Sequence, residues 1–590
     1  MKELQYPFDS EYLLKKRKSI KKELLKQNNL LEKNIAILGG STTNDIKVML
    51  ELFLLDYGIK PNFYESEYNK FYEDAVFGNE ELDNFKPDII YIHTTNRNIM
   101  NFPNITESKE EVDEKLEQEY SKFEIVWESL RKKFNTIIIQ NNFEYPYYRL
   151  LGNKETSDIH GKINFINRLN MKFYEYAEKN NNFFINDINY VSASYGLDKW
   201  FNEFYWYMYK YAMELPAIPY LSFNIAKIIK SIYGKNKKAF ALDLDNTLWG
   251  GIVGDDGVEN LAIGADVSGG QVFSEFQQYI KAHKDLGVIL NVVSKNELEN
   301  AMAGLNHVDG VLKPDDFVSI KANWNPKNMN IKELAKELDL GEDSFVFVDD
   351  NPAERKIVEE YVEGIGVPEI DVPENYIKII DKQGYFEMTS FSKEDSKKTK
   401  IYQENSKRAK LMQSFENYED YLISLKMKAE IKNFIPTYIS RIAQLTNKSN
   451  QFNLTTKRYT MPEIEEISQD SNYITLYGKL EDTFGDNGVV SVVIGNKKEK
   501  DLHIDLWLMS CRVLKRDMEY AMMDELVKLC KNENIENIYG YYFPTEKNKM
   551  VKDFYNLQGF KKIDEDEKGN ITWKVKVADY TNKNKVIEVN

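Results

Sequence analysis

The sequence predicts a multidomain α/β protein, and three observations lead to this fold class. The chain has 590 residues, which suggests three or four domains at about 150 residues each. Hydrophobic residues make up 42% of the chain, which is enough to build several cores. Short apolar runs alternate with amphipathic stretches over most of its length, and strands alternating with helices are typical of parallel, doubly wound sheets.

Charge and cysteine content narrow the class of protein. The formal net charge of −16 argues against general nucleic-acid binding, which needs a basic surface. Cys511 and Cys530 are the only cysteines, so no disulfide framework is implied and a reducing, cytoplasmic location is expected. The first residues have no apolar signal segment, and no run reaches the roughly 18 apolar residues of a membrane span. We therefore expect neither a nucleic acid nor a membrane as a partner.

Two regions carry the α/β pattern. In the first, the expected strands are Asn34–Leu38, Asp88–His93, Thr136–Gln140 and Phe183–Asn186, with helices such as Asp45–Tyr57 and Glu111–Lys133 between them. The second begins near Lys235, and its expected elements are the strands Ala239–Leu244, Val288–Val293 and Ser344–Val348 and the helices Gly270–Asp285 and Asn328–Leu338. Each pattern predicts a parallel sheet covered by helices.

The rest of the chain is less regular. A charge-rich stretch from about Ser392 to Leu411 indicates an exposed helix or a linker. Beyond about Lys428, helix and strand signals mix, with expected strands Tyr473–Lys479, Gly488–Ile494 and Leu502–Met509. This mixture predicts a further α+β domain.

The apolar run from Phe240 ends in two carboxylates, Asp243 and Asp245, which are followed by Thr247. Residues i and i+2 of a strand point to the same side, so these acids would repel each other unless a cation lies between them. The D-x-D-x-T spacing therefore indicates a Mg²⁺ site beside a nucleophilic aspartate.

Later elements of the same region add to this motif. The expected strand Val288–Val293 leads to Ser294, and the strand before Asp349 ends in the acidic pair Asp349 and Asp350. Lys327 stands at the start of an expected helix. The carboxyl ends of parallel strands line one crevice where ligands bind, so we expect all these groups to meet there.

This order of motifs resembles the haloacid dehalogenase (HAD) phosphatase superfamily, whose fold is Rossmann-like. The resemblance implies that Asp243 is the nucleophile and Asp245 the acid and base. It also implies that Asp243, the backbone carbonyl of Asp245, and Asp349 with Asp350 hold Mg²⁺. Thr247, Ser294 and Lys327 would bind the phosphate, with Lys321 as a competing candidate for the motif lysine.

The segments between these motifs are short. Between Asp243 and Ser294 there is room for little beyond a loop, one helix and a strand, and the segment from Ser294 to Lys327 is shorter still. Neither can hold a large cap domain, so we expect a capless, open site that suits a large substrate such as a group tethered to a protein.

The flanking residues narrow the resemblance. The stretches 248–257 (LWGGIVGDDG), 323–327 (NWNPK) and 347–355 (FVDDNPAER) are similar to the FkbH-like group of HAD type IIIC enzymes. The resemblance implies four parts, an SGNH-like domain at 1–230, a capless HAD domain at 231–390, a charged helical linker at 391–427 and a GNAT-like domain at 428–590. It also implies loading of a glyceryl unit from 1,3-bisphosphoglycerate onto an acyl carrier protein, with loss of phosphate.

In the N-terminal region, the stretch 39–43 (GGSTT) follows an expected strand and precedes a helix, as does the nucleophile block of SGNH hydrolases. The histidine that would complete a Ser-His-Asp triad is not found at the expected spacing after Asp187 or Asp198. We therefore expect an SGNH- or flavodoxin-like domain without hydrolytic activity.

In the C-terminal region, the stretch from Asn548 to Phe560 is similar to a segment of GNAT acyltransferases. The turn that would hold the pyrophosphate of an acyl donor, Leu514–Tyr520, lacks the glycines that the GNAT pattern uses. Lys515 and Arg516 could meet a phosphopantetheine phosphate instead. The candidates for binding the acyl-pantetheine group are Asn450, Gln451, Arg512, Lys515, Arg516 and Asn548.

Cys511 has two open interpretations. It lies at the end of an expected strand beside Arg512, which favours its thiolate, and the resemblance makes it a candidate carrier of the acyl group as a thioester. A buried structural cysteine is the alternative. His503, on the same expected strand, is a weaker candidate for a base, and Cys530 is expected in the core.

The function favoured by these patterns is Mg²⁺-dependent removal of phosphate from a small phosphorylated acyl donor, coupled to transfer of a glyceryl or similar hydroxyacyl group to the phosphopantetheine thiol of an acyl carrier protein. One alternative is a stand-alone phosphatase acting on a small sugar- or acid-phosphate in surface-polysaccharide or secondary-metabolite biosynthesis. The other is a scaffold that docks carrier proteins without chemistry of its own. The intact aspartates 243, 245, 349 and 350 argue against the scaffold.

Overall fold

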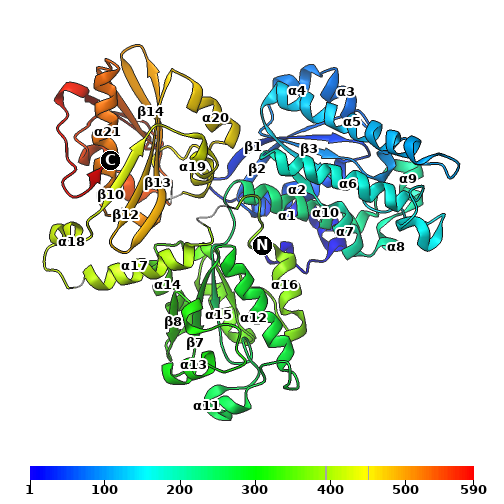
Figure 1. The fold of residues 1–590 in the computed structure, drawn as a ribbon, viewed down its shortest axis with the longest axis horizontal. Coiled ribbons are helices and arrows are strands. Elements are labelled where there is room, and N and C mark those ends of the chain that lie inside the picture. The colour runs from blue at the N-terminus through cyan, green and yellow to red at the C-terminus, as the bar shows by residue number, and fades with distance from the viewer. Residues whose placement is uncertain (392–394, 413, 450, 546) are drawn as a thin grey trace. The chain divides into compact units, whose positions relative to one another are not determined.

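The computed structural model describes residues 1–391, 395–412, 414–449, 451–545 and 547–590 (Figure 1). These form two compact units, one of residues 1–233 with 460–462 and the other of residues 234–459 with 463–590. The described residues form three sheets, one in the first unit and two in the second, so the predicted multidomain α/β architecture is confirmed. Among the described residues, none of the helices has the length and apolar character needed to span a membrane.

The first sheet has five parallel strands in the order β2-β1-β3-β4-β5. The strands are β1 Leu31–Gly39, β2 Ile59–Glu65, β3 Ile89–His93, β4 Ile137–Asn141 and β5 Phe183–Asn186. One face packs against α1 (Ser10–Leu24), α2 (Asn44–Asp56) and α10 (Ile218–Ile232), and the other against α5 (Lys109–Phe134) and α6 (Lys162–Lys179). All four expected strands are confirmed, whereas β2 was missed.

Polar side chains are buried at the carboxyl edge of this sheet. His93 and Glu144 are fully buried; Tyr91 Oη and Asn141 Nδ2 lie 2.9 and 3.0 Å from His93 Nδ1. The Glu144 carboxylate accepts hydrogen bonds from the backbone N–H and the side-chain amide of Asn96. Burial raises the pKa of Glu144 to about 7 and lowers that of His93 to about 3.

The raised pKa of Glu144 predicts that it weakens this domain as the pH rises. Between about pH 4.5 and 7 the native state keeps a proton that the unfolded state has released, so the free energy of unfolding falls, by about 3 kcal/mol over this range. Relative to the natural chain, Glu144→Gln should therefore stabilise the domain more at pH 8 than at pH 5. Hydrogen exchange of peptides that span β3 and β4 measures the difference, with the exposed Glu114→Gln as control. An equal effect at both pH values would contradict a proton on native Glu144.

The second sheet is a four-stranded parallel sheet in the order β8-β7-β6-β9. Its strands are β6 Ala239–Leu242, β7 Ile289–Ser294, β8 Ser319–Ala322 and β9 Phe345–Val348. On one face lie α12 (Gly270–Asp285), α13 (Leu298–Leu305) and α16 (Tyr376–Gln383), and on the other α14 (Lys327–Glu337) and α15 (Pro352–Tyr361). The three expected strands and both expected helices are confirmed.

The connections in this region are as short as predicted. Between β6 and β7 the chain forms only the one-turn helix α11 (Val253–Asp256), a 3₁₀ turn (Val258–Asn260) and α12. Between β7 and α14 it forms α13, a second 3₁₀ turn (Pro314–Asp316) and the edge strand β8. No cap domain is inserted into either connection.

The charged segment after residue 390 contains α17 (Lys398–Met412) and α18 (Tyr418–Ser424). The expected helix is confirmed. The expectation that it is exposed is wrong for one face of α17, which is buried. Tyr402 packs into the core beneath β9, and the side chain of Arg408 is 3% exposed. Arg408 can be buried because its guanidinium is paired with the carboxylate of Asp482 at 2.7 and 2.9 Å.

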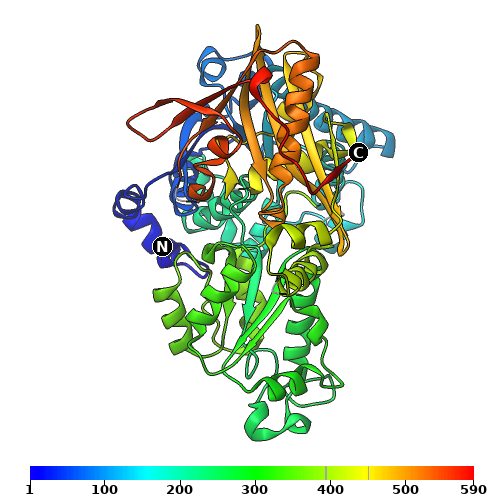
Figure 2. The ribbon, with the colours of Figure 1, turned by 90° about the vertical axis from the view of Figure 1, so that its left-hand side faces the viewer.

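The third sheet is mixed, in the order β16-β17-β15-β14-β13-β12-β10-β18 with β11 added beside β14. Its strands are β10 Lys428–Lys432, β11 Phe452–Asn453, β12 Tyr473–Asp482, β13 Gly485–Lys498, β14 Asp501–Met509, β15 Asn537–Tyr542, β16 Lys561–Glu565, β17 Ile571–Lys576 and β18 Glu588–Val589. Its helices include α19 (Pro436–Lys448), α21 (Met518–Asn532) and α22 (Phe554–Leu557). The turned view in Figure 2 shows α21, in orange, lying along the strands.

The strands β14 and β15 are parallel but pair over only three residues, from Asp501 to His503. Further along, the short strand β11 pairs with the other end of β14, and the N–H of Phe543, just after β15, donates to the carbonyl of Leu454. The segment after α19 therefore fills the gap where β14 and β15 diverge.

Candidate active site

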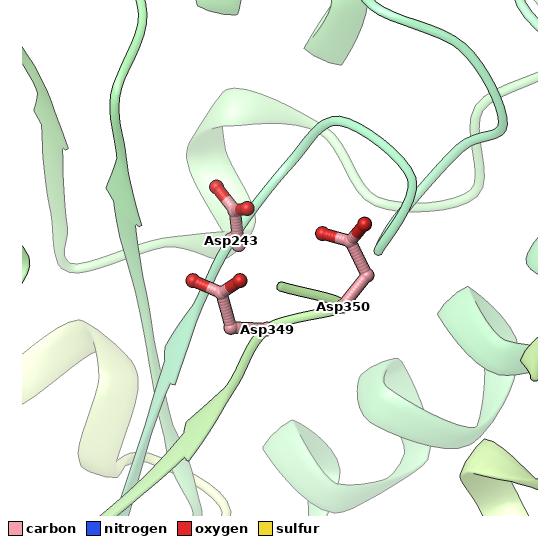
Figure 3. Close-up of side chains that lie close together, drawn as sticks. All are labelled: Asp243, Asp349 and Asp350. Atoms are coloured by element: carbon pink, nitrogen blue, oxygen red, sulfur yellow. The ribbon is translucent and has the colours of Figure 1, made fainter. Parts of the chain in front are cut away.

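Three carboxylates meet at the carboxyl ends of neighbouring strands in the second sheet. Asp243 follows β6, and Asp349 and Asp350 follow β9 (Figure 3). Asp243 and Asp349 are buried and Asp350 is half-buried, and one oxygen atom from each lies within 4.8 Å of the others. Such a group of hard oxygen donors suits Mg²⁺.

Backbone contacts hold this arrangement. The N–H of Asp243 donates to the carbonyl of Val348 at 2.9 Å, which continues the β6–β9 ladder to the point where the carboxylates begin. Asn246 then adopts a left-handed conformation with φ of 54°, which turns the chain out of the sheet. The hydroxyl of Thr247 is fully buried and accepts from the N–H of Asp350 at 3.2 Å, so this expected phosphate ligand ties the two loops together.

Lys327 reaches the carboxylates from the first turn of α14. Its Nζ lies 2.9 Å from Asp243 Oδ2 and 2.5 Å from Asp349 Oδ2, and the residue is 3% exposed. Lys321 instead lies on β8, where its Nζ pairs with Glu337 and Glu333 at 2.5 and 3.2 Å. The structure thus brings Lys327 to the site and leaves Lys321 outside it.

The electrostatics of the site favour a bound cation. Burial and the neighbouring Asp243 raise the pKa of Asp349 to about 7 and also raise that of Asp350. Burial opposes the charge on Lys327, but Asp243 and Asp349 together outweigh it and raise the pKa of the lysine. Three carboxylates facing one lysine leave the site short of positive charge, and a divalent cation would supply it.

Asp245 is held apart from these three by its own hydrogen bonds. Its Oδ1 accepts from Trp249 Nε1 at 2.8 Å and from the N–H of Val253 at 3.0 Å, and its Oδ2 accepts from Asn296 Nδ2 at 2.9 Å. Burial raises the pKa of its carboxyl. An oriented carboxyl with a raised pKa suits a proton donor.

Sequence reasoning missed Trp249 and Asn296. Both could have been found from spacing, because Trp249 is one helical turn past Asp245 and Asn296 follows the strand-end residue Ser294 by two positions. Ser294 itself is the last residue of β7, is buried, and pairs in register with Ala322 of β8.

Comparison with known proteins agrees with these motifs. Residues 34–230 match the family model described as FkbH, N-terminal domain. A crystal structure of the N-terminal part of the protein BF1531 from Bacteroides fragilis, containing a phosphatase domain and complexed with Mg, is 29% identical. It aligns with a TM-score of 0.58 over 64% of this chain and 99% of its own. The N-terminal third of the chain is thus similar to the FkbH N-terminal domain.

Other solved structures resemble the C-terminal region more weakly. The ribosomal-protein-S18-alanine N-acetyltransferase of Escherichia coli is 9% identical, covering 25% of this chain and 94% of its own with a TM-score of 0.21. Ard1 of Thermoplasma volcanium is 18% identical, covering 25% and 97% with a TM-score of 0.20. No curated protein matches the chain in sequence.

The C-terminal binding candidates differ in burial and in their hydrogen-bond partners. Arg516 is buried and donates to Asp482, to Asn405 and to the carbonyl of Arg512. Lys515 is exposed, with a left-handed φ of 62°. Arg512 is buried, with its Nε 3.2 Å from Ser510 Oγ. Arg516 therefore serves the fold of the domain, whereas Nη1 of Arg512 has no hydrogen-bond partner among the described residues.

Asn548 is fully buried and holds backbone groups of its own domain. Its Nδ2 donates to the carbonyls of Asn453 and Phe543 at 2.9 Å, and its Oδ1 accepts from the N–H of Thr545 at 2.7 Å. These contacts fasten β11 to the loop after β15. Gln451 is half-buried immediately before β11, and Asn450 lies outside the described residues.

The backbone of Cys511 begins a 3₁₀ turn (Cys511–Val513) directly after β14, but its side chain lies outside what the structure describes. Cys530 is in the core, as expected, and burial raises its pKa to about 12. His503 lines a cavity of about 210 Å³ with Lys457, Asp505 and Tyr541, whose hydroxyl lies 2.6 Å from His503 Nδ1. Burial lowers the pKa of His503.

Among the described contacts of the N-terminal domain, no serine pairs with a histidine. Ser41 is buried, and His93 is engaged with Tyr91 and Asn141. His160 lies against Asp158 and the carbonyl of Glu107.

Proposed function

We propose that the chain is a Mg²⁺-dependent phosphatase of the HAD type. The observation that carries this proposal is the meeting of Asp243, Asp349 and Asp350 around Lys327 at the carboxyl edge of a parallel sheet. The side chains of these aspartates and the backbone carbonyl of Asp245 would hold the ion. When bound, Mg²⁺ supplies positive charge that offsets the charge on the transferring phosphoryl group.

The residues of the site divide the chemistry between them. A carboxylate oxygen of Asp243 attacks phosphorus, and the bond from phosphorus to the leaving oxygen breaks. Asp245 gives its proton to that oxygen and then takes a proton from the water that hydrolyses the aspartyl-phosphate. Trp249 and Asn296 fix the carboxyl of Asp245 through both of its oxygens. Lys327 and Ser294 hold the phosphoryl oxygens.

The finer proposal concerns the substrate. We propose that the donor is a phosphoglyceryl-type acyl phosphate, 1,3-bisphosphoglycerate, and that the glyceryl group passes to the phosphopantetheine thiol of an acyl carrier protein. The thiolate of Cys511 attacks the acyl carbonyl of the donor, and the C–O bond to the phosphate breaks so that inorganic phosphate leaves. The phosphopantetheine thiolate then attacks the resulting thioester, and the thiolate of Cys511 leaves. The HAD site hydrolyses the remaining phosphate ester, which makes the transfer irreversible. The FkbH-like sequence and the short connections around the site support this proposal.

Cys511 provides a specific test of the transfer. With 1,3-bisphosphoglycerate, Mg²⁺ and a phosphopantetheinylated carrier protein, intact mass spectrometry should show a glyceryl gain on the carrier. Cys511→Ala should abolish both this gain and an acyl adduct on the enzyme, because the thioester carrier is lost. Cys530→Ala is the matched control, since Cys530 is in the core.

Two outcomes would contradict parts of this proposal. An acyl adduct that survives in Cys511→Ala would remove the cysteine as the carrier. Phosphate release that needs no carrier protein and keeps its rate in Cys511→Ala would favour a stand-alone phosphatase on a small phosphate ester. Both results come from the same samples. Intact mass spectrometry detects the acyl group, and a phosphate assay measures hydrolysis.

A further inference from the structure

The cavity beside His503 lies in the C-terminal domain, and none of its lining residues belongs to the aspartate site. Its walls come from β13, β14, β15 and the segment after β11. The volume of about 210 Å³ is below the roughly 300–1,000 Å³ of pockets that hold drug-sized ligands. The cavity therefore suits a small molecule or one small group of a larger one.

The position of the cavity follows from the divergence of β14 and β15. The last paired residues of these strands are His503 and Tyr539. Beyond this pair, Asp505 on β14 and Tyr541 on β15 line the cavity. Thr455, which follows β11, donates its hydroxyl hydrogen to the backbone carbonyl of Asp505 at 2.7 Å. Because this carbonyl already has a donor, the side chains of the wall are the groups that a ligand would meet.

Aromatic rings form a large part of the wall. The ring of His503 stacks on that of Tyr539, with centroids 4.8 Å apart, and is nearly parallel to the ring of Tyr541 at 6.1 Å. The hydroxyl oxygen of Tyr541 lies 2.6 Å from His503 Nδ1, and the ring of Phe543 is 6.4 Å from that of Tyr541. Such rings offer an apolar surface next to polar atoms.

The charges in the wall favour a neutral ligand. Lys457 Nζ lies 2.8 Å from Asp505 Oδ1, so these two charges offset each other. Burial lowers the pKa of His503, and the exposed Lys498 adds to this effect, so the imidazole is mainly neutral at pH 7. An anion in the cavity would meet the carboxylate of Asp505, and a cation would meet two lysines.

The polar atoms of the wall require a ligand that both donates and accepts hydrogen bonds. The carboxylate of Asp505 only accepts and the ammonium of Lys457 only donates, whereas the amide of Asn496 and the hydroxyl of Tyr541 do both. A hydroxyl group matches all of these partners. The carbon atoms that carry such hydroxyls would pack on the rings.

We propose that this cavity binds a small, neutral, polyhydroxylated group. Its hydroxyls would bind Asp505, Asn496 and Tyr541, and its carbon atoms would lie against the aromatic wall. Two sources share this chemistry, a sugar residue and the hydroxyacyl group of an ester or thioester. The second source rests on the proposed acyl transfer, and the first does not.

Saturation-transfer NMR of the full chain, without Mg²⁺ or carrier protein, tests binding separately from catalysis. The probes are methyl glycerate, methyl α-glucoside, glycerate and methyl propionate. They present a hydroxyacyl ester, a sugar, a hydroxylated carboxylate and an ester without hydroxyls. We expect saturable binding of at least one of the two neutral hydroxylated probes, weaker binding of glycerate and none of methyl propionate. The tighter of the two neutral hydroxylated probes identifies the source.

Tyr541→Phe and Tyr539→Phe are a matched pair of variants. Each removes one hydroxyl from the same stack of rings, but only Tyr541 lines the cavity, and the hydroxyl of Tyr539 accepts from Lys574 at 2.8 Å. Tyr541→Phe should weaken the Kd by about tenfold, the effect of one lost hydrogen bond. Tyr539→Phe should keep the Kd of the natural chain. Melting curves of both variants show whether a lost affinity comes from unfolding.

Four outcomes would overturn the proposal. Methyl propionate that binds as tightly as the hydroxylated probes would exclude recognition of hydroxyls. Glycerate that binds more tightly than methyl glycerate would indicate a site for an anion. Failure of both neutral hydroxylated probes to bind, or equal Kd values in the two tyrosine variants, would exclude this cavity as their site. The comparisons among probes use the natural chain, so they hold even where a variant unfolds.

Discussion

Replacing Asp243 with asparagine is expected to lower Mg²⁺-dependent phosphate release by at least about a thousandfold, which corresponds to about 4 kcal/mol of transition-state stabilisation. An amide cannot form the aspartyl-phosphate, and it also removes a carboxylate from the group that would hold Mg²⁺. Release of inorganic phosphate from a small phosphate ester or acyl phosphate, with and without a chelator, measures the loss.

Two further variants make this result specific. Asp255→Asn changes an exposed aspartate near the same loop and should leave the rate unchanged. Asp245→Asn should accumulate a phosphorylated enzyme, visible by intact mass, because its site keeps the nucleophile but lacks the base that hydrolyses the intermediate. Asp243→Asn with half of the natural rate would rule out Asp243 as the nucleophile.

The second large effect is expected at Lys327. Lys327→Met should reduce phosphate release by about a hundredfold or more, because the phosphoryl group loses its nearest cation. Lys321→Met should stay within about threefold of the natural rate, since Lys321 pairs with Glu333 and Glu337 outside the site. Steady-state phosphate release at saturating Mg²⁺ compares the two variants.

Lys327→Met also leaves the carboxylates of Asp243 and Asp349 facing each other without a cation. Removing one partner from a buried ion pair costs on the order of 3–5 kcal/mol, so the variant should melt at a lower temperature. Mg²⁺ should then raise its melting temperature more than that of the natural chain, because the ion restores the missing positive charge. Comparable losses of activity in both lysine variants would contradict the assignment of Lys327.

The sequence was a good guide to groups placed at strand ends. Asp243, Ser294, Asp349 and Asp350 follow buried parallel strands, and alignment of those strands in one sheet is enough to bring them to one edge. Spacing also predicted that no cap domain interrupts the sheet. Spacing did not decide which of Lys321 and Lys327 is the motif lysine, because both lie in the connection after β7. Only the fold separates them, by placing Lys321 on β8 and Lys327 on α14.

The features that sequence reasoning missed depend on neighbours distant in the chain. The strand β2 contains Pro61 and Asn62, which disfavour a strand, but an edge position tolerates a residue without an N–H. The sequence made Arg516 a candidate phosphate ligand, and it contains no sign that Arg516 pairs with Asp482. Asn548 likewise fitted a binding motif, and only the fold shows that backbone carbonyls engage its amide. No local pattern reports such long-range partners.

The strand β11 has a consequence for how this domain can bind an extended molecule. Where β14 and β15 diverge, the backbone groups of β14 that an incoming chain would pair with are already bonded to Phe452 and Asn453. The carbonyl of Leu454 is likewise bonded by the N–H of Phe543. A ligand that lies along β14 must therefore compete with a covalently attached strand at very high effective concentration. Recognition by side chains at the rim avoids this competition, while insertion into the sheet would require the β11 segment to leave first.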